Sequence, residues 1–272
     1  MNNLHRELAP ISDAAWAQIE EEVARTFKRN LAARRVVDFE GPSGPTASSV
    51  GTGHLKTLAP PAPGIEARQH IVRPLVELRV PFELSREAID DVERGSNDSD
   101  WQPAKDAAEK LALAEDRMVF LGYKAAAIDG MRAGSSNPQL TLPDDVTRYP
   151  DVVAQALKQL RLVGVDGPYT VLLGAEAYTA LSEGNDGGYP VLKHINTLVD
   201  GGILWAPALE GAIVLSKRGG DFEIRMGRDL SIGYSSHTDS AVRLYLEESL
   251  TFLLHAPEAA VALVPGGKAR RA

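Results

Sequence analysis

Three segments in the last third of the chain decide the fold: GGDF at residues 219–222, GRDLSIGY at 227–234 and VRLYLEESLTF at 242–252. Apolar and polar residues alternate along these segments, and glycines separate them. This pattern is typical of half-buried β-strands joined by tight turns, and it is not typical of a catalytic loop. The sequence therefore predicts two or three strands of one sheet in this part of the chain.

The composition predicts a folded protein with a sizeable core. The chain has 272 residues, and 44% of them are hydrophobic, which is enough for one large domain or two intertwined lobes. No apolar run approaches the roughly 18 residues of a membrane span, and the first residues lack the apolar stretch of a signal peptide. We therefore expect a cytoplasmic protein without a membrane partner.

Charge and cysteine content exclude several functions. The formal net charge is −8, whereas nucleic-acid binding depends on clustered Lys and Arg, so we expect no nucleic-acid partner. The short basic tail with Lys268, Arg270 and Arg271 is an exception, and a solvated terminus explains it. The chain has no cysteine, which excludes disulfides, thiolate metal sites and cysteine nucleophiles.

An amphipathic helix is predicted near the start of the chain, with Ser12 as its N-cap. The apolar residues that follow recur every three or four positions and therefore share one helical face: Trp16, Ile19, Val23, Phe27 and Leu31. This face can pack on the chain's own core or on a partner, and periodicity alone does not decide between the two.

Residues 41–74 mix glycine with proline throughout, so they cannot form a helix. A structureless loop of this length is uncommon within a compact domain, and the segment is predicted to project. Short alternations at 49–50 and 54–58 suit a two-stranded extension whose free edges need a partner. A loose surface insertion is the alternative.

The longest helix is predicted to begin at Pro103 and to reach about Gly130 or Gly134. Before it, residues 73–84 predict a strand, and Ser85 is placed to cap a short helix through Asp91. The apolar seam of the long helix recurs at steps of four and three: Ala107, Leu111, Ala114, Met118, Leu121, Ala125 and Ile128. At 1.5 Å per residue the seam would be roughly 40 Å long, and neighbouring apolar residues widen it enough to favour packing across a sheet.

A compact α/β stretch follows, and its alternation of elements predicts a mixed sheet flanked by helices. The expected helices are 151–163, 175–181 and 191–199, and the expected strands are 169–173, 203–205 and 212–216. A polar loop at 184–190 interrupts this stretch.

No catalytic constellation is visible in the sequence. The chain lacks a phosphate-binding Gly-rich loop, a Gly-x-Ser-x-Gly elbow and a His-Glu-x-x-His helix. Its six histidines are scattered singly, and the acidic run at 90–100 lacks the ligand spacing of a calcium loop. We therefore expect no enzyme activity, no cofactor and no metal site.

The strand segments, together with three further stretches, carry a resemblance to a known family. The matching stretches are Phe27-Lys28 through Gly41-Pro42, Glu93-Arg94-Gly95 and Asp166-Gly167-Pro168-Tyr169-Thr170. Over roughly residues 1–264 the chain resembles the encapsulins of the family 1 type, and actinobacterial members in particular. These are nanocompartment shell proteins with the capsid fold of tailed phages.

The resemblance implies an α+β subunit with a peripheral domain, an axial α/β domain and an extended β-arm loop. The peripheral domain would take residues 1–40, 75–134 with a long spine helix on a β-sheet, and strands in 219–264. The extended loop would be 41–74, the axial domain 135–218, and 265–272 a flexible tail.

The resemblance also implies self-assembly into a hollow icosahedral shell of about 60 copies, because identical subunits close symmetrically. Such a shell encloses an enzyme, in related systems a dye-decolorising peroxidase or a ferritin-like protein, through a short C-terminal targeting peptide. The residues that match the peptide-binding groove are Phe27, Leu31, Arg34, Val36, Asp38, Asp229, Leu230 and Ile232. Apolar members would anchor the peptide, and the charged ones would fix its register.

The family also places a loop of the axial domain around the five-fold axis. The matching residues here are Asn185, Asp186, Gly187, Gly188 and Tyr189. Repeated around an axis, Asp186 would form a negative ring that favours cations.

Three alternative functions remain at this point. A phage or prophage major capsid protein would share the fold, but no scaffold segment is obvious in the short N-terminal region. A secreted bacteriocin or protease would need an export signal and a nucleophile, and neither is visible. An unrecognised cytoplasmic hydrolase would form a small oligomer instead of a large particle.

Overall fold

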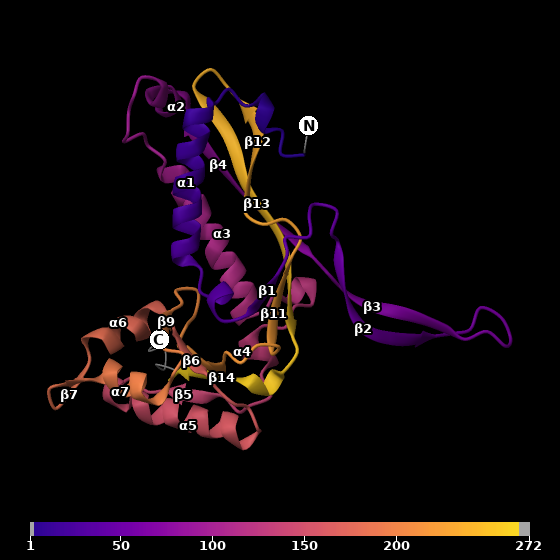
Figure 1. Ribbon diagram of the computed structural model, residues 1–272, viewed down its shortest axis with the longest axis vertical. Coiled ribbons are helices and arrows are strands. Elements are labelled where there is room, and N and C mark those ends of the chain that lie inside the picture. Colours follow the sequence, from indigo (N-terminus) through magenta and orange to yellow (C-terminus); the bar gives the residue numbers. More distant parts are fainter. Residues whose placement is uncertain (1–2, 267–272) are drawn as a thin grey trace, which may run out of the picture.

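Strand β13 (Ala241–Leu254) is the axis of the first lobe. In the computed structural model, which describes residues 3–266, β13 pairs antiparallel with β4 (Val76–Ser85), β12 (Ser231–His237) and β11 (Phe222–Met226). A short strand, β1 (Asp38–Glu40), adds to β11 in parallel. The strands predicted in the last third of the chain are therefore confirmed, and they form one sheet (Figure 1).

Helices cover one face of this sheet in two layers. Helix α3 (Gln102–Phe120) packs on β4 and β13, and helix α1 (Asp13–Asn30) packs on α3 (Figure 1). The predicted N-cap is confirmed, because Ser12 Oγ accepts a hydrogen bond from the Ala15 backbone at 3.3 Å. Two short helices accompany them: η1 (Arg6–Leu8) precedes α1, and α2 (Arg86–Glu93) precedes α3. The predicted apolar face of α1 is buried against the chain's own core.

The long helix ends at Phe120, so the prediction that it reaches Gly130 or Gly134 is wrong. Gly122 adopts a left-handed φ of 88°, and Tyr123 and Ile128 close a small antiparallel bridge around η3 (Lys124–Ala126). Helix α3 is about 28 Å long at 1.5 Å per residue. Of the predicted seam residues past Phe120, Ile128 is buried, Leu121 is half-buried and Ala125 is exposed. A short helix, α4 (Met131–Gly134), follows.

The second lobe is built on a mixed sheet of the order β5-β14-β10-β6-β9. Strands β6 (Tyr169–Leu173), β9 (Ile203–Trp205) and β10 (Ala212–Ser216) lie where the sequence predicts them. The sequence did not predict β5 (Leu140–Leu142) or β14 (Ala260–Pro265). Helices α5 (Tyr149–Leu162), α6 (Ala175–Glu183) and α7 (Val191–Leu198) flank the sheet and confirm the predicted helices. The 3-10 turns η4 (Val146–Arg148) and η5 (Pro257–Ala259) complete this lobe.

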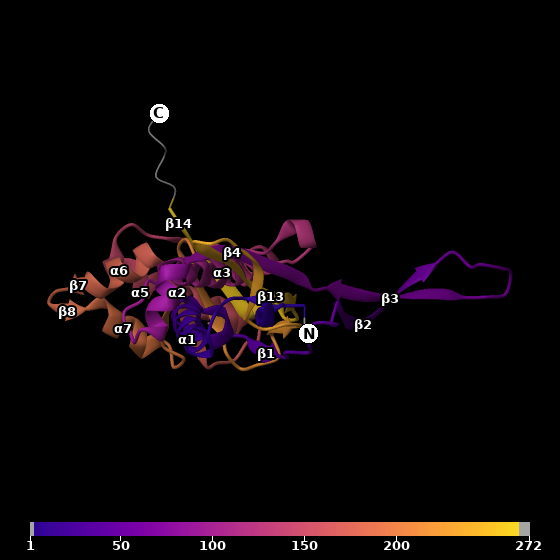
Figure 2. The same cartoon turned by 90° about the horizontal axis from the view of Figure 1, so that it is seen from above.

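Two hairpins extend from the lobes. Strands β2 (Ser49–Leu58) and β3 (Ala67–Pro74) form a long arm that projects far from the body, which confirms the predicted two-stranded extension (Figures 1 and 2). The arm forms a sheet of its own with two free edges. The predicted polar loop at 184–190 contains a small hairpin of β7 (Asn185–Asp186) and β8 (Tyr189–Pro190) at the far end of the second lobe (Figure 2).

The domain boundaries remain proposals, and residues 267–272 of the predicted tail lie outside the described residues. Among the residues that the structure describes, no helix has the length and apolarity needed to cross a bilayer.

Gly130 generates a first prediction, because its backbone packs directly on that of Gly122. A Cβ at Gly130 would lie 2.1 Å from the Gly122 nitrogen, so Gly130→Ala forces two backbone segments apart. We expect the free energy of unfolding to fall by about 1–3 kcal/mol, as for other overpacked sites, in urea denaturation followed by circular dichroism. Gly51→Ala is the control, since nothing lies within 4 Å of that added Cβ. Equal stability of the two variants would contradict the close contact.

Candidate functional site

The turn that follows the first helix brings several charged side chains together. Arg34 lies in η2 (Ala33–Arg35), between α1 and β1. Its guanidinium donates from Nε and Nη2 to the two carboxylate oxygens of Glu115 on α3, at 2.8 and 2.6 Å. Nη1 donates to Asp229 Oδ1, in the turn between β11 and β12, at 2.8 Å. Glu248 Oε2 on β13 lies 3.4 Å from Nη2. We call these four residues the Arg34 cluster.

Burial strengthens the interactions between the charged groups of the Arg34 cluster. The side chains of Glu115 and Glu248 are fully buried, Arg34 is largely buried, and Asp229 is partly exposed. Burial lowers the pKa of the Arg34 guanidinium, but its bonds to Glu115 and Asp229 reverse this and leave the pKa above its ordinary value. Burial, followed by the charge of Glu115, raises the pKa of Glu248 well above its usual range. One guanidinium therefore faces more carboxylates than it can neutralise.

Asp116 fixes the same turn from its backbone side. Its two carboxyl oxygens accept hydrogen bonds from the Ala32 and Ala33 nitrogens, both at 2.9 Å. Burial raises the pKa of Asp116 to about 7, although the two backbone donors oppose this shift. Helix α3 therefore holds the exit of α1 through two neighbouring acidic side chains.

The structure brings together six of the eight residues that the resemblance assigns to a peptide-binding groove. Phe27, Leu31 and Ile232 are buried in one apolar cluster, and Leu230 packs against it half-buried. Arg34 and Asp229 lie at its edge, with the Arg34 guanidinium 5.3 Å from the centre of the Phe27 ring.

Val36 and Asp38 lie apart from this group. Val36 belongs to the other apolar core. The Asp38 carboxylate accepts a hydrogen bond from the Gly220 nitrogen at 2.5 Å. Both residues line a separate cavity of about 100 Å³ between the chain after η2 and the 216–222 turn.

Sequence reasoning missed four residues of this region. Phe39 is an aromatic side chain with 38% of its surface exposed, and its ring centre lies 4.9 Å from the Arg34 guanidinium. Glu115, Asp116 and Glu248 are buried acids. A usable signal exists for two of them: Glu115 lies between Leu111 and Met118 of the helical seam, and Glu248 lies between apolar positions of a strand. A charge on an apolar face needs a partner.

The residues predicted to form a pore lie together in the β7–β8 hairpin. Asn185, Asp186 and Tyr189 are exposed, and Gly187 and Gly188 form the turn with left-handed φ angles of 55° and 91°. The Tyr189 ring stacks on His194 at 4.6 Å between ring centres. The Lys193 ammonium lies 5.9 Å from the centre of the same ring. The hairpin therefore presents a polar tip whose tyrosine contacts α7.

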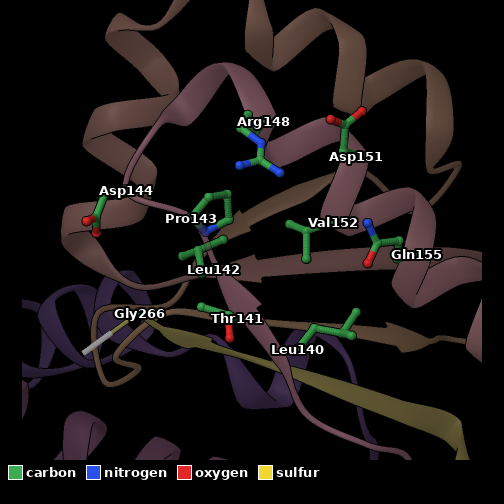
Figure 3. A pocket seen from close by; sticks show the side chains of 10 residues that line it. All are labelled: Leu140, Thr141, Leu142, Pro143, Asp144, Arg148, Asp151, Val152, Gln155 and Gly266. Atoms are coloured by element: carbon green, nitrogen blue, oxygen red, sulfur yellow. The ribbon is translucent and has the colours of Figure 1, made fainter. Parts of the chain in front are cut away.

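A cavity of about 580 Å³ lies elsewhere, between β5 and α5 (Figure 3). Arg148, Asp151 and Gln155 stand on its helical side, and Thr141 and Leu142 stand on its strand side (Figure 3). Among residues 3–266, its lining includes no histidine or lysine and only one hydroxyl group, that of Thr141. This lining offers no nucleophile paired with a base, so the cavity does not support catalysis.

Comparisons with known proteins give a consistent result over most of the chain. A family model described as "Encapsulating protein for peroxidase" matches residues 1–251. The chain is 59% identical over 263 residues to the type 1 encapsulin shell protein of Mycobacterium tuberculosis, covering 97% of this chain and 99% of that protein. It is 57% identical to the type 1 encapsulin shell protein of Rhodococcus erythropolis, with coverage of 97% and 100%.

Solved structures show the same fold at low identity. A virus-like particle from Pyrococcus furiosus matches with a TM-score of 0.67 at 15% identity, covering 91% of this chain and 98% of that chain. Gordonia phage Cozz matches with a TM-score of 0.55 at 12% identity, covering 86% and 85%. The fold of the subunit is therefore that of phage capsid proteins.

Proposed function

The chain belongs to the family of encapsulating proteins for peroxidase, the type 1 encapsulin shell proteins, and from this premise we propose that it encloses a cargo enzyme that carries a C-terminal targeting peptide. The chain is a shell protein that forms a capsid-like compartment. Its relatives are named as structural shell proteins, so it is not an enzyme. The hydrolase alternative is thereby excluded.

The β2–β3 arm is the observation that supports assembly most directly. Its exposed apolar side chains have 40–52% of their surface accessible: Leu55, Leu58, Ile65, Ile71 and Val72. A two-stranded ribbon alone is marginally stable in water, so this arm needs another copy to cover it. We propose an icosahedral shell of about 60 copies, which would weigh about 1.8 MDa for a chain of 29.2 kDa. A phage capsid is the weaker alternative, because those proteins share the fold at 11–12% identity.

The cargo-docking surface is the partly exposed rim of the groove, formed by Arg34, Phe39, Asp229 and Leu230. Phe39 supplies an accessible aromatic face, Leu230 adds apolar area beside it, and Asp229 leaves one carboxylate oxygen, Oδ2, without a described partner. An extended peptide with apolar and polar residues is the ligand that such a rim fits. Phe27, Leu31 and Ile232 would shape the floor of the rim from the core. Val36 and Asp38 would support the rim by fixing the chain between Arg34 and Phe39.

The cargo is proposed as a peroxidase of the dye-decolorising type, with a ferritin-like protein as the second candidate. The description of the family favours the peroxidase. We expect the filled compartment to reside in the cytoplasm, and fractionation of cells that express the chain tests this. Recovery of the particles in the membrane or secreted fraction would contradict that placement.

The β7–β8 hairpin is proposed to surround a pore through the shell wall. Its exposed tip at one end of the molecule and its two glycines allow several copies to converge around an axis. Asp186 would then give the opening a negative ring.

Charges on the arm should prevent assembly without unfolding the lobes. In Leu55→Asp with Ile71→Asp, two apolar contacts worth about 1.5–3 kcal/mol each are lost and two charges would have to be buried. We expect particles near 1.8 MDa to fall at least about tenfold in mass photometry, with an unchanged circular dichroism spectrum. Lys56→Asp, on an exposed polar position of β2, is the control and should assemble. Normal shell yield from the double variant would contradict the role of the arm.

Loss of the Phe39 ring should lower cargo loading. Phe39→Ser is the chosen change because Phe27 and Ile232 are buried, and charges there would unfold the core. We expect the amount of co-purified cargo per shell to fall about tenfold, the effect of removing about 1.4 kcal/mol of binding free energy, in quantitative mass spectrometry. Leu162→Ser, on a leucine that is 75% exposed in the second lobe, is the control. Undiminished loading in intact Phe39→Ser shells would refute this docking surface.

Reversal of the pore charge should change which ions enter the shell. For Asp186→Lys we expect cationic dyes to enter several-fold more slowly and anionic dyes faster, because the ring of charge changes sign. Dye uptake into empty shells by stopped-flow fluorescence measures this. Glu210→Lys, an exposed charge reversal outside the hairpin, serves as the reference. Identical entry rates for both variants and the parent would count against the pore.

A further inference from the structure

Two consecutive glutamates of β13 have opposite electrostatic situations. Both are buried, and because side chains alternate along a strand they face opposite sides of the sheet. Glu247 has two cationic partners, Arg79 with Nε at 3.1 Å and Arg228 with Nη1 at 3.1 Å. Glu248 has only Arg34 within ion-pair distance among residues 3–266, at 3.4 Å, and Glu115 and Asp229 already hold that guanidinium.

The Arg34 cluster therefore contains one more negative group than its geometry can accommodate. Three carboxylates face one guanidinium: Glu115 from α3, Glu248 from β13 and Asp229 from the β11–β12 turn. The neighbour of Glu248 on β4 is the apolar Leu78. Glu248 Oε1 is buried and accepts no hydrogen bond from a nitrogen or hydroxyl group in the described part of the chain, and the neighbouring carboxylate of Glu115 could accept a proton from Glu248. A proton on Glu248 removes the excess charge, and the raised pKa of this carboxyl agrees with that state.

We propose that Glu248 carries a proton in the resting shell, and that loss of this proton draws Arg34 away from Asp229 and loosens the turn at residues 227–230. Glu248 is thereby a proton-dependent positioning residue for one wall of the cargo-docking surface. Only the effect of Glu248 on the cargo-docking surface rests on the proposed function.

The geometry decides which bond of Arg34 yields. Glu115 is fully buried and binds the guanidinium of Arg34 through two oxygens, so these two hydrogen bonds persist. Asp229 binds through the single Nη1 contact, and 39% of its side chain is exposed, so water can replace Arg34 there. An ionised Glu248 competes for the guanidinium from the buried side. The contact between Arg34 and Asp229, which is single and partly exposed to solvent, is therefore the first to break.

The change follows a rise in pH through the raised pKa of Glu248. A carboxyl whose pKa is raised in the folded protein stabilises the fold while protonated, and this contribution is lost as the pH rises through the folded-state value. Buried glutamates can titrate as high as about pH 8–9. Asp116, whose pKa is raised to about 7, also titrates within the range tested, but its oxygens bind Ala32 and Ala33 at the exit of α1. Its titration is common to the parent and to Glu248→Gln, so a comparison of the two isolates the effect of Glu248.

Hydrogen–deuterium exchange of assembled, cargo-free shells tests the proposal. The readout is the protection of residues 227–232, corrected for the intrinsic effect of pH, from about pH 6 to about pH 10. In the parent protein we expect protection to fall about tenfold over this range. Glu248→Gln keeps the size and neutrality of the protonated acid, so its protection should stay constant. Glu83→Gln, an exposed change on β4, should behave like the parent.

A second variant keeps the proposal open to refutation if Glu248→Gln does not assemble. Asp229→Asn removes the charged contact at its exposed end, so the turn should have low protection at every pH. The same alkaline loss in Glu248→Gln as in the parent, no loss in the parent, or an unchanged pH response in Asp229→Asn would each overturn the proposal. Because no cargo is present, these outcomes do not depend on whether cargo docks at this surface, which Phe39→Ser tests separately.

Discussion

The buried ion pair between Arg34 and Glu115 is the interaction on which the first lobe depends. It ties the end of α1 to the middle of the helical layer and, through Asp229 and Glu248, to two parts of the sheet. Removing one partner of such a pair is costly, about 3–5 kcal/mol, because the other charge stays buried alone. With Asp116 binding the adjacent backbone, the passage of the chain from helix to sheet edge is defined by directed bonds more than by apolar contact.

The two lobes share one apolar core and therefore act as a single body. The cluster that fills the second lobe also includes Met118 and Phe120 from the end of α3, and Phe222 and Phe252 from the first sheet. Strand β13 runs in the first sheet, and β14 follows it into the second. The residues of the two hairpins, β2–β3 and β7–β8, do not belong to this shared core.

Much of this fold could be predicted from local patterns. Alternation and glycines in 219–252 predict the strands of the first sheet, and the spacing from Trp16 to Leu31 predicts α1 and its buried face. Strand β14 was missed because its apolar run is short and its partners, β5 and β10, are distant in sequence. The end of α3 was missed because residues 121–128 keep the apolar spacing of the helix although Gly122 turns the chain.

The functional region was predictable only in part, for a related reason. Resemblance assigned Arg34 and Asp229 to one site, and the structure joins them. Their buried partners come from segments 81 and 214 residues away from Arg34, and no local pattern connects those positions. Whether a side chain such as Ile232 is accessible to a peptide or lies beneath the groove depends on its burial. The alternation of residues along a strand does not report this burial.

The arm has a geometric consequence of its own. At about 3.3 Å per residue, the ten residues of β2 extend roughly 33 Å. If the ribbon keeps this length, a neighbouring subunit can cover its apolar tip only at a limited range of distances and tilts between the two copies. Where the arm lies on a neighbouring copy, as proposed above, its length would limit the radius at which identical copies can close.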